Sequence, residues 1–140
     1  MVYVIESDFL QVIDQDDLDI LKTGGSLDGA VLKAVQEAST YLAVDYDTDK
    51  IFDVDDPIIS EYVQGHIVDI ALYHLHARIN PRNIPEIRVQ RRDDAVKWLK
   101  DVANPRTNIT APKAFPRRDY GENRGSDISW GSRKKRNNYY

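Results

Sequence analysis

The stretch from Ile58 to Ala77 is apolar on most of its sides, which leaves this chain few possible folds. A helix with so wide an apolar surface is stable in water only where neighbouring segments cover several of its faces. Pro57 stands where the first turn of a helix tolerates it, with Asp55 or Asp56 expected as the cap, and Asn80-Pro81 ends the stretch. The sequence therefore predicts a central helix with other helices around it.

Two more segments have the periodicity of helices. From Leu27 to Leu42, apolar residues recur every three or four positions, and Ser26 is the expected N-cap. Apolar residues have the same spacing from Glu86 to Val102, a segment that follows Pro85 and precedes Asn104-Pro105. We expect both helices to pack against the central one.

The N-terminal part and the interval 44–56 carry weaker signals. Ser7 or Asp8 is expected to cap a short first helix, and Leu18 and Leu21 lie on a second short turn. The interval 44–56 is interpreted as an acidic loop. Because no stretch of the first 103 residues alternates convincingly with a period of two, we predict an all-α fold, a small bundle of about four helices.

The composition changes after residue 103. Proline and glycine recur over 104–140, without apolar periodicity, and such a segment cannot offset its own ordering entropy. Its aromatic side chains nevertheless belong to types that are favoured at interfaces. We therefore predict a helical domain over 1–103 and, over 104–140, a long extended basic arm that orders on a partner. The expected interface residues of this arm are Phe115, Arg117, Arg118, Tyr120, Trp130, Arg133, Lys134, Lys135, Arg136, Tyr139 and Tyr140.

Charge is divided unequally along the chain. Residues 1–80 carry 4 basic and 16 acidic side chains, whereas residues 81–140 carry 15 basic and 7 acidic ones. Opposite charges steer association and set the register between protein surfaces. The division indicates a protein that docks onto a partner or onto copies of itself, rather than an enzyme.

An acidic segment resembles a calcium-binding loop in part. Asp45, Asp47, Asp49 and Asp56 stand at positions 1, 3, 5 and 12 of an EF-hand-like pattern. The glycine that the pattern requires at position 6 is replaced by Lys50, which repels a cation. We interpret the segment as a solvated acidic loop or as a contact for a neighbour's basic arm.

The remaining patterns do not indicate catalysis. The predicted central helix carries His66, His74 and His76, which are interpreted as helix histidines because no metal-binding motif surrounds them. The chain has no cysteine and no Gly-x-Ser-x-Gly elbow, and the glycine-rich segment 24–29 lacks the lysine of a phosphate-binding loop. We therefore expect no catalytic residue, no metal and no cofactor.

A nucleic-acid-binding accessory module is the alternative function. Basic side chains of the arm would neutralise phosphates, and its rings would stack on bases. Against this, the acidic first half of the chain repels nucleic acid.

No membrane association is expected either. No run approaches the length of apolar sequence that crosses a bilayer, and Met1–Asp8 lacks the basic and apolar regions of a secretory signal. We expect a protein that is made and used in a cytoplasm.

The helical part resembles the small head–tail connector proteins of tailed bacteriophages (neck or head-completion proteins), notably the phage Mu-type group. The likeness covers about residues 3–103, and the basic arm is not part of it. The residues that carry it are Tyr3, Ser7-Asp8-Phe9-Leu10, Ile13, Asp17-Leu18, Leu21, Leu27–Leu42, Pro57, Asp69–Leu75 and Asp94–Ala103. The chain departs from the pattern of this family at two places. It has the acidic loop where the family has a Tyr-Leu-Pro stretch, and Asn104-Pro105 where the family has a glycine.

The resemblance implies a non-enzymatic virion protein of the neck, made in the host bacterial cytoplasm. Copies of it, commonly twelve to match the portal, would form a ring beneath the portal protein. Such a ring extends the DNA channel, through which DNA passes without sequence-specific binding. It also offers a platform to the next neck or tail ring protein.

Overall fold

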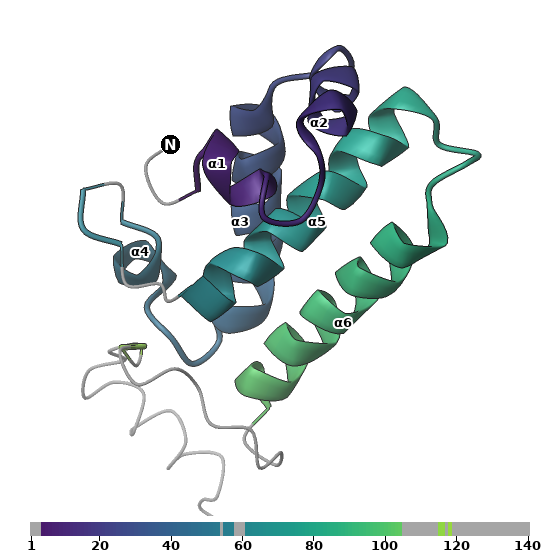
Figure 1. Cartoon of the computed structure of the whole chain (residues 1–140). Helices are drawn as coiled ribbons and strands as arrows, with labels where there is room; N and C mark the ends of the chain where they lie inside the picture. The colour runs from purple at the N-terminus through teal and green to yellow at the C-terminus, as the bar shows by residue number, and fades with distance from the viewer. Residues whose placement is uncertain (1–3, 54, 58–60, 105–114, 117, 119–140) are drawn as a thin grey trace, which may run out of the picture.

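The computed structural model describes residues 4–53, 55–57, 61–104, 115, 116 and 118, and its helices form a small bundle (Figure 1). The helices are α1 (Glu6–Phe9), α2 (Gln15–Lys22), α3 (Leu27–Leu42), α4 (Thr48–Ile51), α5 (Glu61–Ile79) and α6 (Glu86–Ala103). This part of the chain contains no strand, so the all-α prediction is confirmed. None of these helices is both long enough and apolar enough to cross a membrane.

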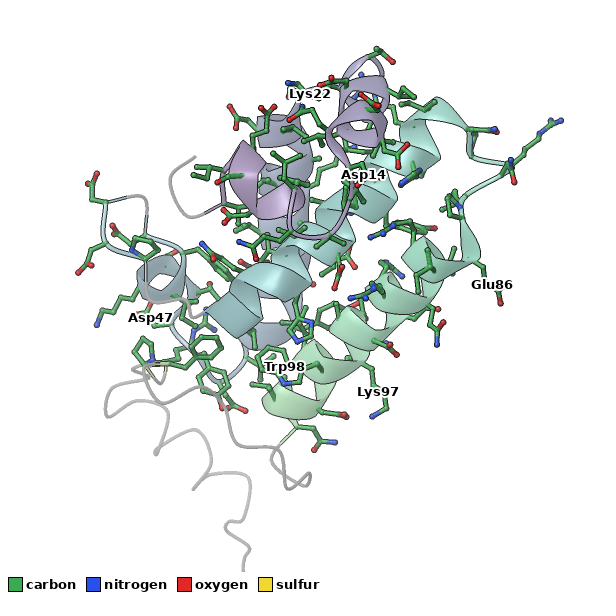
Figure 2. All side chains as sticks on the ribbon, viewed as in Figure 1. Asp14, Lys22, Asp47, Glu86, Lys97 and Trp98 are labelled. Atoms are coloured by element: carbon green, nitrogen blue, oxygen red, sulfur yellow. The ribbon has the colours of Figure 1, made fainter. Side chains whose placement is uncertain are left out.

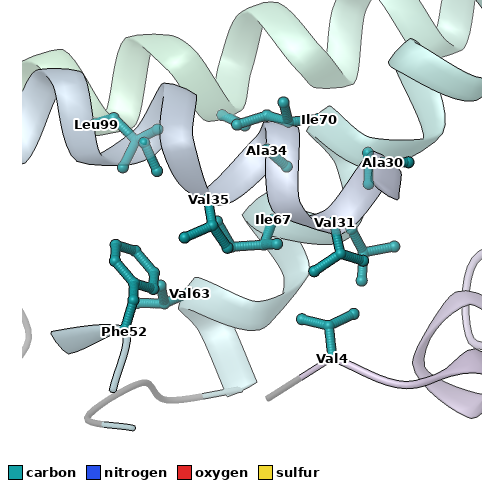
Figure 3. Close-up of a cluster of buried hydrophobic side chains, with 14 of the residues drawn as sticks. Val4, Ala30, Val31, Ala34, Val35, Phe52, Val63, Ile67, Ile70 and Leu99 are labelled. Carbon is teal, nitrogen blue, oxygen red and sulfur yellow. The ribbon is translucent and has the colours of Figure 1, made fainter. Parts of the chain in front are cut away.

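The central position predicted for the stretch from Ile58 to Ala77 is confirmed by α5. This helix packs against α3 and α6 as well as α1 and α2, and its Ile67, Ile70 and Leu72 are fully buried. Figure 3 shows Ile67 and Val63 among side chains of α3 and of the N-terminal segment. Neighbours therefore cover this helix on several faces.

The other two long helices also follow the sequence prediction. Helix α3 buries its Ala30, Ala34 and Ala38, small residues that permit a close approach to α5. The Ser26 hydroxyl accepts the Gly29 N–H at 2.9 Å, so this N-cap is confirmed. Helix α6 begins directly after Pro85, as expected.

The N-terminal helices differ in detail from the prediction. Helix α1 begins at Glu6 after Ile5, and Asp8 is not the N-cap: its carboxylate accepts the Ile5 N–H at 2.8 Å from inside the helix. Helix α2 is a two-turn helix rather than a short turn, because Leu18 and Leu21 are both buried on one side of it.

The interpretation of 44–56 as a plain loop was wrong. Helix α4 lies within it, and an Asp47 carboxylate oxygen accepts the Lys50 N–H at 3.3 Å at its start. Tyr46, Ile51 and Phe52 are buried and tie the segment to the core. The expected cap near Pro57 lies beside residues 58–60, which are outside the described part of the chain.

Candidate interface surfaces

The start of the predicted arm lies against α4 and the residues before it. Phe115 is only 8% exposed, and its ring meets that of Tyr46 edge-on at 5.7 Å. The Asp47 N–H donates to the Pro116 carbonyl, and the Arg118 N–H donates to the Asp45 carbonyl, both at 2.9 Å. We call the described residues Phe115, Pro116 and Arg118 the arm anchor.

This placement differs from the expectation for one interface residue. Phe115 was expected on a partner, but it belongs to the hydrophobic core of its own chain, where its ring packs against that of Tyr46. Arg118 is exposed, as an interface residue must be. The other expected interface residues lie outside the described part of the chain: Arg117, Tyr120, Trp130, Arg133, Lys134, Lys135, Arg136, Tyr139 and Tyr140.

Substituting Phe115→Ala is expected to release the arm anchor while the helices remain folded. Truncating a buried phenylalanine costs about 3 kcal/mol, roughly a hundredfold in a local opening equilibrium. Amide hydrogen exchange at Asp47 and Arg118 should therefore accelerate by about that factor. The matched control is Arg118→Ala, which removes an exposed side chain and leaves both backbone bonds. Equal exchange in the two variants would show that Phe115 does not hold the anchor.

Exposed acidic side chains gather at one end of the bundle, and the opposite end carries basic and acidic side chains together. The acidic end, at and after α4, includes the exposed Asp49, Asp53, Asp55 and Asp56. The mixed-charge end, at and near the α5–α6 turn, carries the exposed Arg78, Arg82 and Arg91 together with the exposed Glu86 and, on α2, Asp17. Figure 1 shows α5 running from one end to the other, and Asp47 and Glu86 mark the two ends in Figure 2.

The acidic end has a defined turn. One carboxylate oxygen of Asp53 accepts the N–H groups of Asp55 and Asp56, at 2.8 and 3.0 Å. These two backbone hydrogen bonds lower the pKa of Asp53, so its charge is retained in the turn. Asp47 and Asp53 therefore accept hydrogen bonds from backbone amides of this segment, which stabilises its two turns.

A hollow of about 370 Å³ lies beside the mixed-charge end, between α2, α5 and the start of α6, and the exposed Asp17 of α2 is part of its lining. The exposed side chains of Ile20, Ile79 and Ile87 are at its rim, with exposed fractions of 59%, 39% and 49%. Arg88 also lines it, but this side chain is only 9% exposed, and its Nη1 has no hydrogen-bond partner in the described part of the chain. We call this site the Arg88 hollow.

The charge on Arg88 is poorly compensated. Burial lowers the pKa of Arg88, and Asp69 and Asp17 oppose the shift without an ion pair to it. Burial in turn raises the pKa of Asp69, and its Oδ1 likewise has no hydrogen-bond partner among the described residues. Sequence reasoning missed this site because Arg88 has the spacing of an ordinary helix arginine.

The three histidines take three different roles along α5. The ring of His66 stacks on Trp98 of α6 at 4.7 Å (Trp98 is labelled in Figure 2), His74 bonds to Glu37 of α3, and His76 lines the Arg88 hollow. No group of three potential metal ligands occurs within the described residues. His66 and His74 thus take part in contacts between helices.

Stability is expected to fall on mild acidification. Burial lowers the pKa of both His66 and His76 from the ordinary value of 6.5. Protonation then favours the unfolded chain, so stability is lost as the pH falls below about 6.5. Asp94 near His66 and Asp17 near His76 reduce the effect, and protonation of Asp69 opposes it at lower pH.

The measurement is the thermal midpoint between about pH 7.5 and pH 5.5. The variant His66→Phe, which keeps a ring against Trp98, should show a smaller decrease than the natural chain. An unchanged midpoint over this range in the natural chain would contradict the proposed cost of protonating the two histidines.

Comparison with known proteins gives one result. The family model "Bacteriophage Mu, Gp36" matches residues 3–124, which include all six helices and the arm anchor. No curated protein and no solved structure gives a match.

Proposed function

Because the chain belongs to the bacteriophage Mu Gp36 family and is therefore a phage protein, we propose that it is a head–tail connector of the virion neck. In this proposal it has no enzymatic activity. About twelve copies, as in the connectors it resembles, form a ring under the portal that extends the DNA channel and links the capsid to the tail. The next ring of the neck or tail binds to the opposite side.

The observation that carries this proposal is the family match over residues 3–124, and the exposed carboxylates gathered at one end of the helical bundle add to it. Ring assembly requires heterologous contacts, in which one surface of a subunit meets a different surface of its neighbour. A body with an acidic end and a mixed-charge end offers two different surfaces for such a contact. Pairing between the carboxylates of one end and the arginines of the other would set register and association rate.

The charge of the bundle also suits a DNA channel. The first 80 residues carry 16 acidic and 4 basic side chains. Acidic walls repel the DNA backbone, so DNA can pass through the ring without adhering to it. We expect the basic arm to point away from the channel, towards the portal or the next subunit.

Two truncations test the role of the arm. A chain of residues 1–118 keeps the arm anchor, whereas a chain of residues 1–104 also uncovers the apolar site at Tyr46 and Phe52. We expect the chain of residues 1–118 to have the helical content and thermal midpoint of the full chain. It should nevertheless lose most of its binding to the portal. Undiminished portal binding by residues 1–118 would contradict a docking role for the rest of the arm.

The same pair of truncations tests the nucleic-acid alternative. Its support is the excess of basic residues in the second half of the chain. If the full chain binds DNA but ignores the portal, and residues 1–118 bind neither, the arm is a nucleic-acid-binding segment.

A further inference from the structure

We infer that a hollow between the start of α3 and the end of α5 is a binding site for a phosphate group, which Lys33 and Arg78 hold. The inference concerns the single chain, so it goes beyond the proposed ring and does not depend on it. Three observations lead to it: a hollow without acidic lining, two cations without partners, and a backbone that leaves room for one of them.

The first observation is the lining of this hollow, which we call the α3–α5 hollow. It has a volume of about 390 Å³ and lies between two helices that pack against each other (Figure 1). Lys33 lines it from α3, and His74 and Arg78, four residues apart on one face of α5, line it from the other side. The remaining described lining is neutral, and none of it carries a carboxylate. In this respect the α3–α5 hollow differs from the Arg88 hollow, which Asp17 lines.

The second observation is that both cations lack a partner. Residues 1–80 carry four basic side chains among 16 acidic ones. Two of the four form ion pairs within the chain: Lys22 with Glu6, and Lys50 with Asp47. The other two are Lys33 and Arg78, whose exposed side chains form no ion pair or hydrogen bond within the described part of the chain. In a segment so rich in carboxylates, two unpaired cations in one hollow indicate a site for an anion from outside.

Acidic side chains on α3 do not compensate these cations. Glu37, one turn after Lys33, bonds to His74 and to Arg92 of α6, and it is not part of the lining. Asp28 lines a neighbouring hollow together with Lys22. The described lining of the α3–α5 hollow therefore carries a net positive charge.

The third observation is the place of Arg78 against the backbone before α3. A Cβ atom at Gly25 would stand 3.1 Å from Cδ, 3.2 Å from Nε and 3.3 Å from Cζ of Arg78. The lack of a side chain at Gly25 therefore lets the guanidinium lie directly against the chain at this point. The neighbouring Ser26 hydroxyl accepts the Gly29 N–H, a bond that does not use its own proton.

These donors suit a phosphate group better than a carboxylate. The planar guanidinium of Arg78 can donate two parallel hydrogen bonds to phosphate oxygens, and the ammonium of Lys33 supplies a second charge. The two side chains reach the hollow from different helices. Phosphate oxygens point in several directions, so one phosphate group can bond to both, whereas the two oxygens of a carboxylate lie in one plane.

A phosphate titration of the full chain, followed by amide chemical shifts, tests the site. Sodium phosphate replaces sodium chloride at constant ionic strength, so that screening does not change. The amides of Gly25, Ser26 and Gly29 report on the α3–α5 hollow alone, which separates it from the basic side chains of the arm. We expect their shifts to saturate. Shifts that increase linearly with phosphate, or no shifts, would overturn the inference.

Two pairs of variants assign the binding to its residues. Arg78→Gln and Lys33→Gln each remove a charged donor, so each should raise the Kd for phosphate at least about tenfold. The matched controls, Arg82→Gln and Lys50→Gln, change exposed side chains outside the hollow and should alter the Kd less than about twofold. Circular dichroism should show unchanged helical content in all four. An Arg78→Gln chain that binds phosphate as the natural chain does would contradict the assignment.

A short oligodeoxynucleotide, titrated in the same way, identifies the source of the phosphate group. Saturation of the same amides at a lower concentration than inorganic phosphate requires would assign the site to a nucleic-acid phosphate. Saturation by inorganic phosphate alone would assign it to a free ion or a small phosphate ester. A response to neither probe would show that the site does not exist. Because the titration uses neither portal protein nor ring, that failure would leave the connector proposal unaffected.

Discussion

Replacing Glu37 with alanine is expected to lower the free energy of unfolding by about 3 kcal/mol. Glu37 lies on α3, and its two carboxylate oxygens reach the other two long helices: one bonds to Arg92 of α6 at 2.8 Å and the other to His74 of α5 at 3.2 Å. The side chain of Glu37 is only 19% exposed, so its removal leaves the charge of Arg92 largely buried without its partner. Among the described residues, Arg92 then keeps its contact with the ring of Tyr73 and a longer one with Asp93.

The measurement is urea unfolding followed by circular dichroism, which reports the helices directly. Glu37→Gln keeps a hydrogen-bond acceptor but removes the charge, so its free energy of unfolding should fall by roughly half as much as in Glu37→Ala. Glu86→Ala, an exposed acidic residue on α6, is the matched control and should change stability by less than about 0.5 kcal/mol. If Glu37→Ala and the control have equal free energies of unfolding, the contact of Glu37 with Arg92 and His74 does not stabilise the bundle.

Reversing the charge of one end of the bundle is expected to abolish assembly, and combining two reversed chains is expected to restore it. Arg78→Glu with Arg82→Glu leaves acidic side chains in excess at both ends, and Asp49→Lys with Asp55→Lys and Asp56→Lys gives the acidic end an excess of basic ones. Each variant alone brings like charges together at every subunit contact, which costs several kcal/mol per contact. In a mixture, each altered end meets an end of opposite charge, so the two variants can alternate around a ring.

The measurement is the mass of each sample, alone and mixed, in the presence of the portal protein at low ionic strength. Circular dichroism of each variant checks that its substitutions leave the helices intact. Assembly of either variant alone, to the extent of the natural chain, would show that the charged ends do not meet. Failure of the mixture, with folded components, would contradict the head-to-tail arrangement.

The three long helices could be predicted from sequence because their signals are local. Apolar spacing indicated α3, α5 and α6, and Pro85 and Asn80 marked where helices begin and end. Helix α5 was recognisable as central because apolar residues cover most of its sides, a pattern that only burial on several faces explains.

The segment around α4 could not be predicted because its structure depends on residues distant in sequence. Its many aspartates predicted a segment exposed to solvent. Tyr46 and Phe52 are nevertheless buried, and Phe115 of the arm packs against the ring of Tyr46. Local composition carries no information on such a contact. The arm anchor therefore appeared only in the structure.

The candidate interface was predictable in character but not in position. The division of charge was visible in the sequence, and the basic partner surface was assigned to the arm. The structure adds exposed arginines at the turn between α5 and α6, among acidic side chains, where Arg88 is buried beside exposed isoleucines. Burial of one arginine among several on a helix depends on tertiary packing, which periodicity alone does not determine.

The most direct test of the connector proposal is the solution mass of the full-length chain by light scattering, with and without the candidate portal protein. The proposal predicts a stoichiometric, ring-sized complex when portal is present, whatever the mass of the chain alone. A mass that is unchanged by portal but increases when DNA is added would contradict it and favour a nucleic-acid-binding module.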